Sequence, residues 1–127
     1  MIGIIVTTFL RDNLLLKCLT SIKKYWNENY YLIVIDQGTS SSYKDDFITE
    51  YFKTVNGEYI RTSFDVGPLK ARNIAVKKIQ ELNIPYTLMS ADSILFTKNY
   101  DFTLITEFLE QEPSRFLCSF DIINRIT

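Results

Sequence analysis

The sequence predicts an α/β protein with a parallel sheet between two layers of helices. Short apolar runs, each the length of a buried strand, alternate along the chain with longer stretches whose apolar residues recur at helical spacing. Glycine, proline and asparagine mark many of the connections. Parallel strands need long crossover connections, so this alternation is typical of a sheet covered by helices on both faces. The chain has 127 residues, which fits one domain.

The first half of the chain is expected to form two strands and two helices. Residues 2–6 and 31–35 are continuous apolar runs, as expected for strands that are buried on both faces. Residues 12–26 carry an apolar stripe at helical spacing, and the polar residues at their start can cap a helix. A Ser-rich loop follows the second strand and leads into a short helix over residues 43–53.

The second half is expected to continue the same alternation. Residues 58–62 follow an Asn-Gly turn signal and are predicted to form a strand. A Gly-Pro pair then opens a helix over residues 67–82, with proline in the first turn, where its missing N–H is not needed. Residues 86–89 and 116–120 are predicted as strands, and residues 99–111 as the helix between them.

Composition excludes several classes of function. The 14 basic and 15 acidic residues give a net charge of -1, so no basic surface for nucleic acid is expected. No apolar run approaches the roughly 20 residues of a membrane span, and no signal peptide is evident, so a cytoplasmic location is expected. There is no histidine, so a metal ion would need carboxylate ligands. Cys18 and Cys118 lie far apart, and two buried free thiols are favoured over a disulfide.

Acidic residues follow three successive predicted strands. Asp36, Asp65 and Asp92 each lie at or just beyond the carboxyl end of a strand. In a parallel sheet these ends share one edge, where ligands bind. The alternative is that each aspartate only stabilises a turn or caps a helix, as aspartate often does.

Three common ligand sites of α/β proteins do not fit this edge. The loop after the first strand, residues 7–11, has no glycine, which a dinucleotide-binding fold requires. The phosphate-binding pattern GxxxxGK[ST] is absent, and so are the paired acids of a response-regulator receiver. What remains is an aspartate after the second strand that could read a ribose or base. A single aspartate after the fourth strand could hold a divalent cation against phosphates.

Four stretches resemble the nucleotide-binding half of family 2 glycosyltransferases with the GT-A fold: IIVTTFLRDNLLLKCLTSI, YLIVIDQGTS, FDVGPLKARNIAV and YTLMSADSILFTKNY. They occur in order over residues 2–100. The resemblance implies a Rossmann-like α/β/α three-layer fold with a mostly parallel central sheet. It also implies one nucleotide-sugar-binding domain over residues 1–127 that lacks the acceptor-binding half.

The resemblance implies a nucleotide-sugar site made of Thr8, Phe9, Arg11, Asp36, Gly67, Arg72, Ser90, Ala91 and Asp92. The first three would lie along the base and ribose, and Asp36 would accept a hydrogen bond from the base. On that reading, Asp36→Ala is predicted to abolish nucleotide binding without unfolding the domain. Gly67 would let the backbone pass close to the ligand, and Arg72 would lie near the nucleotide or pyrophosphate. Asp92 matches the last aspartate of the family's DxD motif and would ligate Mn²⁺ or Mg²⁺.

The chain also departs from the family pattern. Ser90 stands where the first aspartate of DxD is usual, Leu10 stands in place of asparagine, and Thr7 stands where proline is frequent. Arg72 could belong only to a solvated basic face of its helix, and Asp65 could merely cap the turn before it.

The resemblance implies a glycosyltransferase donor domain that binds a UDP- or GDP-sugar with a divalent metal for transfer of the sugar to a hydroxyl acceptor. The catalytic base and the acceptor site are expected in the half that is missing, so no catalytic residue is assigned. The alternative is a non-catalytic nucleotide-sugar-binding or assembly module. A nucleotidyltransferase would need a basic glycine-rich loop after the first strand, which is absent. The edge of the last strand could also pair with a second copy, giving a homodimer.

Overall fold

The computed structural model describes residues 1–26, 29–99, 102–112 and 114. Its centre is a four-stranded sheet in the order β3-β2-β1-β4, in which every pairing is parallel. The strands are β1 (Ile2–Thr8), β2 (Tyr30–Asp36), β3 (Gly57–Arg61) and β4 (Thr87–Ala91). The predicted α/β class with a parallel sheet is confirmed, and the strand expected over residues 116–120 lies outside the described residues.

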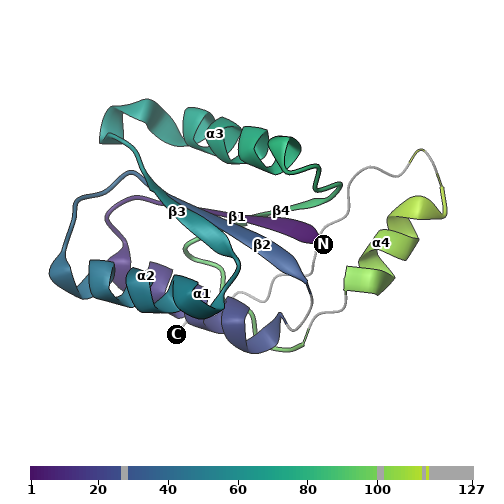
Figure 1. Ribbon diagram of the computed structural model, residues 1–127, viewed down its shortest axis with the longest axis horizontal. Coiled ribbons are helices and arrows are strands. Elements are labelled where there is room, and N and C mark those ends of the chain that lie inside the picture. The colour runs from purple at the N-terminus through teal and green to yellow at the C-terminus, as the bar shows by residue number, and fades with distance from the viewer. Residues whose placement is uncertain (27–28, 100–101, 113, 115–127) are drawn as a thin grey trace, which may run out of the picture.

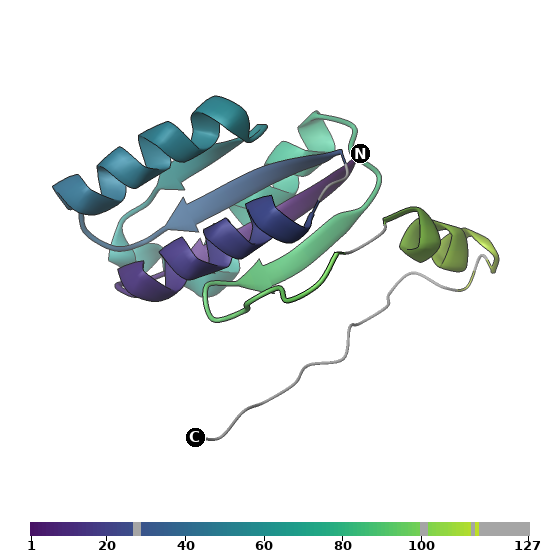
Figure 2. The ribbon, with the colours of Figure 1, turned by 90° about the horizontal axis from the view of Figure 1, so that it is seen from below.

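Helices cover both faces of the sheet, as Figures 1 and 2 show. Helices α1 (Asp12–Tyr25) and α2 (Ser42–Thr54) lie on one face, and α3 (Gly67–Glu81) lies on the other. A short 3₁₀ helix, η1 (Phe64–Val66), precedes α3. Helix α4 (Phe102–Glu110) is shorter than predicted and lies beside the amino-terminal ends of the strands. No helix in the described part of the chain is both long and apolar enough to span a bilayer.

The core is divided by the sheet into two apolar clusters. Alternate residues of β1 point to opposite faces, so Ile4 and Val6 pack towards α1 and α2, whereas Ile5 packs towards α3. On the α3 side the helix contributes Ala71 and Ala75, whose small side chains let it approach the sheet closely. Burial on both faces explains why β1 and β2 are continuous apolar runs in the sequence.

The same alternation determines where the polar residues at the strand ends lie. Thr8 continues the α1–α2 face of β1, and it pairs in register with Asp36, the last residue of β2. Strand β4 pairs with β1 on the other side, so the residue after its end, Asp92, lies at the same edge. Because all four strands are parallel, this carboxyl edge collects all three side chains.

A buried hydrogen bond joins the two helices that cover this face. The Tyr51 hydroxyl of α2 donates to the Leu19 carbonyl of α1 over 2.7 Å, and both residues are buried. We expect Tyr51→Phe to lower the free energy of unfolding by about 1 kcal/mol, the usual net value of a buried hydrogen bond. Urea denaturation would measure it. The control is Tyr43→Phe on the same helix, whose side chain is 71% exposed and whose stability should match the parent. Equal midpoints for both variants would contradict the expectation.

Candidate functional site

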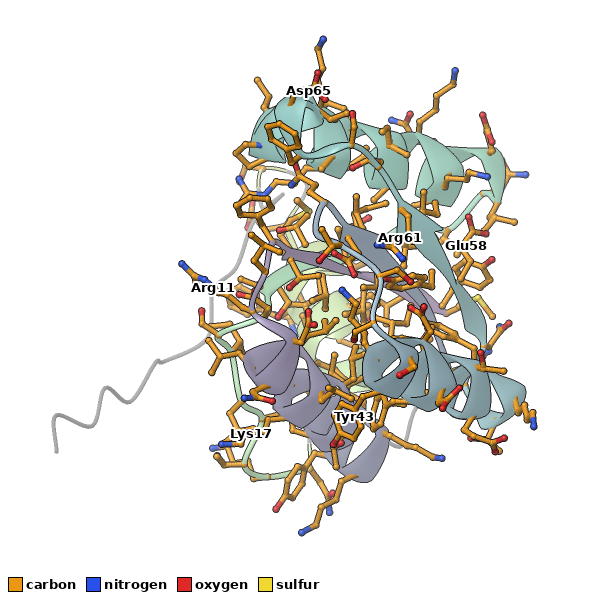
Figure 3. All side chains as sticks on the ribbon, turned by 90° about the vertical axis from the view of Figure 1, so that its left-hand side faces the viewer. Arg11, Lys17, Tyr43, Glu58, Arg61 and Asp65 are labelled. Atoms are coloured by element: carbon orange, nitrogen blue, oxygen red, sulfur yellow. The ribbon has the colours of Figure 1, made fainter. Side chains whose placement is uncertain are left out.

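Thr8 and Asp92 form the first part of the site at the carboxyl edge. Thr8 Oγ1 donates a hydrogen bond to Asp92 Oδ2 over 2.9 Å, and both side chains are buried. The other oxygen, Asp92 Oδ1, lies 3.7 Å from Arg11 Nη1, and the Arg11 side chain is 60% exposed. Figure 3, which views the sheet from its carboxyl end, shows Arg11 projecting outward there. The buried carboxylate of Asp92 is therefore contacted by the Thr8 hydroxyl and faced by the solvent-exposed guanidinium of Arg11.

Asp36 forms the second part, and its carboxylate is completely buried. Oδ1 accepts from the backbone N–H of Gly38 over 2.7 Å. Oδ2 accepts from Lys44 Nζ over 2.8 Å and from the Tyr59 hydroxyl. Burial alone would raise the pKa of Asp36, but the donors from Lys44, Tyr59 and Gly38 outweigh it and hold the pKa below its ordinary value.

Lys44 is as deeply buried as its partner. Besides Asp36, its ammonium donates to the Thr39 carbonyl over 2.7 Å and to Asp12 Oδ1 over 3.1 Å. Burial would lower the pKa of Lys44, but the hydrogen bonds to Asp36 and Asp12 raise it above the ordinary value. The lysine is therefore charged, with all three of its protons used.

The loops that follow β1 and β2 touch each other beside these groups. Gln37 N–H donates to the Thr8 carbonyl over 3.0 Å. A Cβ added to Gly38 would lie 3.1 Å from the backbone nitrogen of Leu10, so glycine allows this close approach. From β3, Arg61 Nη2 donates to the Gly38 carbonyl over 3.0 Å. The second loop is thus held by donors from several elements.

The remaining residues expected in the site lie in different surroundings. Phe9, in the loop after β1, is exposed at the carboxyl edge. Gly67 begins α3 and Arg72 lies in its second turn, on the opposite face of the sheet from Thr8, Asp36 and Asp92. Gly67 has a φ of +81°, which favours glycine, and nothing lies within 4 Å of an added Cβ there. Arg72 is exposed.

Ser90 and Ala91 are part of β4 rather than of the loop beyond it. Ser90 pairs with Val6, and its Oγ is buried without a hydrogen-bond partner among the described residues. The Ala91 carbonyl accepts from the Cys18 thiol, with 3.5 Å between sulfur and oxygen. Burial, aided by the charge of Asp92, raises the pKa of Cys18 to about 12, so this buried free thiol stays protonated. Cys118 lies outside the described residues.

Asp92 is the residue of this edge that could serve a metal ion. Within residues 1–26, 29–99, 102–112 and 114, no group of three or more cysteine or acidic side chains could hold a metal ion. The ligand available at this point is the Asp92 carboxylate, which the Thr8 hydroxyl orients by donating to Oδ2. Mg²⁺ and Mn²⁺ often use only one or two protein carboxylates and complete their shell with phosphate and water. The donor set therefore fits a cation that binds together with a phosphate ligand.

Several residues around this edge were not expected from the sequence: Asp12, Lys44, Tyr59 and Arg61. One signal was present for Lys44. It shares a helical stripe with Phe47, Ile48 and Tyr51, at the spacing of residues that face the core. A lysine at such a position must find a buried acidic partner. The partnerships of Tyr59 and Arg61 depend on strand pairing and have no local signal.

Comparison with known proteins gives one family and one recurring fold. The sequence model of glycosyl transferase family 2 matches residues 3–125. Among solved structures, S. aureus TarS is similar with a TM-score of 0.69 at 17% identity, over 87% of this chain and 19% of TarS. TarS 1–349, alone and in complex with UDP, gives a TM-score of 0.69 at 18% identity, over 87% of this chain and 32% of that one. The chain thus spans less than a third of each of these structures, and the likeness at this identity shows a shared fold. No curated protein is significantly similar to the chain.

Proposed function

The chain belongs to glycosyl transferase family 2, and on that premise we propose that its carboxyl edge binds a nucleoside-diphosphate sugar. The observation that carries the proposal is the convergence of Thr8, Asp36 and Asp92 on one face at that edge. The two loops beside which such a ligand would lie are already joined, because the Gln37 N–H donates to the Thr8 carbonyl and Lys44 donates to both the Thr39 carbonyl and Asp12. A site that is ordered before binding loses less entropy when the ligand arrives.

The diphosphate is proposed to bind on the Asp92 side of the site. Asp92 would hold Mn²⁺ or Mg²⁺, and such a cation supplies charge compensation for the departing diphosphate. Thr8 orients the Asp92 carboxylate through its hydrogen bond. Arg11 faces the same carboxylate from solvent and is free to turn towards phosphate oxygens, which guanidinium groups bind well.

The base is proposed to lie against the loops after β1 and β2. The exposed ring of Phe9 offers an apolar surface next to Thr8. Asp36, in contrast, has no exposed oxygen, and its carboxylate already accepts from three donors. A nucleotide base could donate a hydrogen bond to Asp36 only after one of these three donors had moved away. We therefore assign Asp36 the role of holding the loop that follows β2. Gly67 and Arg72 would reach the ligand from the α3 side of the edge.

Transfer of the sugar to a hydroxyl acceptor is part of the proposal. The acceptor's proton requires a base, and no described residue is assigned to that step. A second candidate, a binding or assembly module without chemistry, is favoured by Ser90. Where the family usually has the first aspartate of DxD, this chain has a serine in β4 whose hydroxyl oxygen is buried.

Isothermal titration calorimetry of the chain with UDP and with GDP, each with and without Mn²⁺, tests the proposal. We expect saturable binding of one nucleotide below about 1 mM, which corresponds to roughly -4 kcal/mol, and tighter binding with Mn²⁺. Mn²⁺ alone is the control and should bind weakly, because one carboxylate makes a poor site. No heat from either nucleotide at millimolar concentration would refute the proposal. Release of free sugar from a bound UDP-sugar, or its transfer to added glycans, would favour the enzyme over the binding module.

A further inference from the structure

We propose that Lys44 is a positioning residue, which sets the spacing of the two loops that form the ligand site without touching the ligand. The proposal rests on the proposed function for the identity of that ligand. Lys44 lies in the first turn of α2, and none of its side chain is exposed. It is therefore placed behind the site rather than in it.

The ammonium of Lys44 joins three separate segments. It binds Asp36 at the end of β2, the Thr39 carbonyl in the following loop, and Asp12 at the start of α1. These contacts measure 2.8, 2.7 and 3.1 Å. An ammonium has three protons to donate, so each contact uses one, and their directions fix the segments relative to one another.

Stability alone does not explain a lysine at this position. The neighbouring residues on the same face of α2 are apolar, and Ile48 and Tyr51 are buried in the core. A buried ion pair often stabilises a protein no more than well-packed apolar side chains of similar volume do. In addition, the ion pair favours one relative position of the segments that carry its partners, because its hydrogen bonds are strong only in that arrangement.

Two of the segments that Lys44 joins lead directly to residues of the proposed site. Asp12 follows Arg11, which faces Asp92 at the outer side of the site. Asp36 pairs with Thr8, whose hydroxyl binds the same Asp92 carboxylate. Releasing the ammonium would let the loop after β1 and the loop after β2 move apart. The expected consequence is weaker binding of a ligand that must contact both.

Asp12→Asn is the first test, because it weakens one of the three contacts and leaves the buried pair intact. The Asp12 side chain is partly exposed, so the variant should fold. Asp46→Asn, an exposed position on α2, removes the same charge and is the matched control. With Mn²⁺ present, we expect Asp12→Asn to bind UDP about tenfold more weakly than the parent, and Asp46→Asn to bind within about twofold. Parent-like binding by Asp12→Asn would overturn the proposal.

A second measurement needs no ligand and separates this proposal from the proposed function. Amide hydrogen exchange of the free protein is followed at Gln37 and Gly38, whose N–H groups bind Thr8 and Asp36. Relative to Ile33 within β2, both amides should exchange at least about tenfold faster in Asp12→Asn and in Lys44→Met. Unchanged relative exchange in the folded variants would refute the role of Lys44. If the parent binds no nucleotide but these two amides exchange faster in the variants, the proposed function fails while the positioning role of Lys44 stands.

Discussion

Asp36→Ala should lower the free energy of unfolding by about 3–5 kcal/mol, the range found when one partner of a buried ion pair is removed. The substitution leaves the Lys44 ammonium without its closest carboxylate in a site that water does not reach. It also removes the acceptor of the Gly38 N–H and of the Tyr59 hydroxyl. The sequence alone predicted lost binding with an intact fold, and the complete burial of this carboxylate argues against an undisturbed fold.

The pH dependence of stability gives this prediction a second signature. The folded protein holds the pKa of Asp36 below its ordinary value. The contribution of ionised Asp36 to the free energy of unfolding is therefore complete above about pH 4 and is lost as the pH falls through the pKa of the folded state. Lys44, with a raised pKa, contributes stability that is complete below about pH 10 and is lost as the pH rises further. Urea denaturation of parent and variant from pH 2 to 10 would therefore show the largest difference near neutrality. Asp46→Ala, at an exposed position, should stay within about 0.5 kcal/mol of the parent. An Asp36→Ala deficit that does not shrink in acid would contradict the ion-pair explanation.

Most of the strands and helices could be predicted because their signals are local. Residues 2–6 and 31–35 are apolar without interruption, and both lie within the strands β1 and β2. The Gly-Pro pair at 67–68 begins α3 as predicted. Strand β4 extends two residues further than expected, because Ser90 and Ala91 pair with β1 although neither has a strong strand preference. Tertiary pairing, which the sequence does not display, decided that boundary.

The candidate site could be predicted only in part, for the same reason. That Asp36 and Asp92 share an edge follows from parallel strands, whose carboxyl ends must coincide. That Asp36 is sealed by Lys44 and Tyr59 depends on contacts between residues that are distant in sequence. The sequence could therefore place two carboxylates at the edge, but it could not show that one of them, Asp36, is completely enclosed by its partners.

Asp92→Asn is expected to weaken UDP binding in the presence of Mn²⁺ at least about a hundredfold, roughly 2.8 kcal/mol. Asparagine has the same shape and can still accept from Thr8, so the edge should keep its structure. What it loses is the charge that would balance the cation, and an amide oxygen is a much weaker ligand than a carboxylate. Without Mn²⁺ the two proteins should bind UDP about equally, since the affected step is the joint binding of cation and diphosphate.

Asp65→Asn provides the matched control, because it changes the other acidic residue that the sequence placed at this edge. Asp65 is exposed in η1 on the α3 side of the sheet (Figure 3). Its carboxylate accepts a hydrogen bond from the Ser63 hydroxyl. If Asp92 holds the cation, Asp65→Asn should leave Mn²⁺-dependent affinity within about twofold of the parent, as expected for a surface charge. If Asp65→Asn lost as much Mn²⁺-dependent affinity for UDP as Asp92→Asn, or more, the cation site would have to be assigned to the α3 side of the edge. Thr8 would then have no part in metal binding, because its hydroxyl is committed to Asp92.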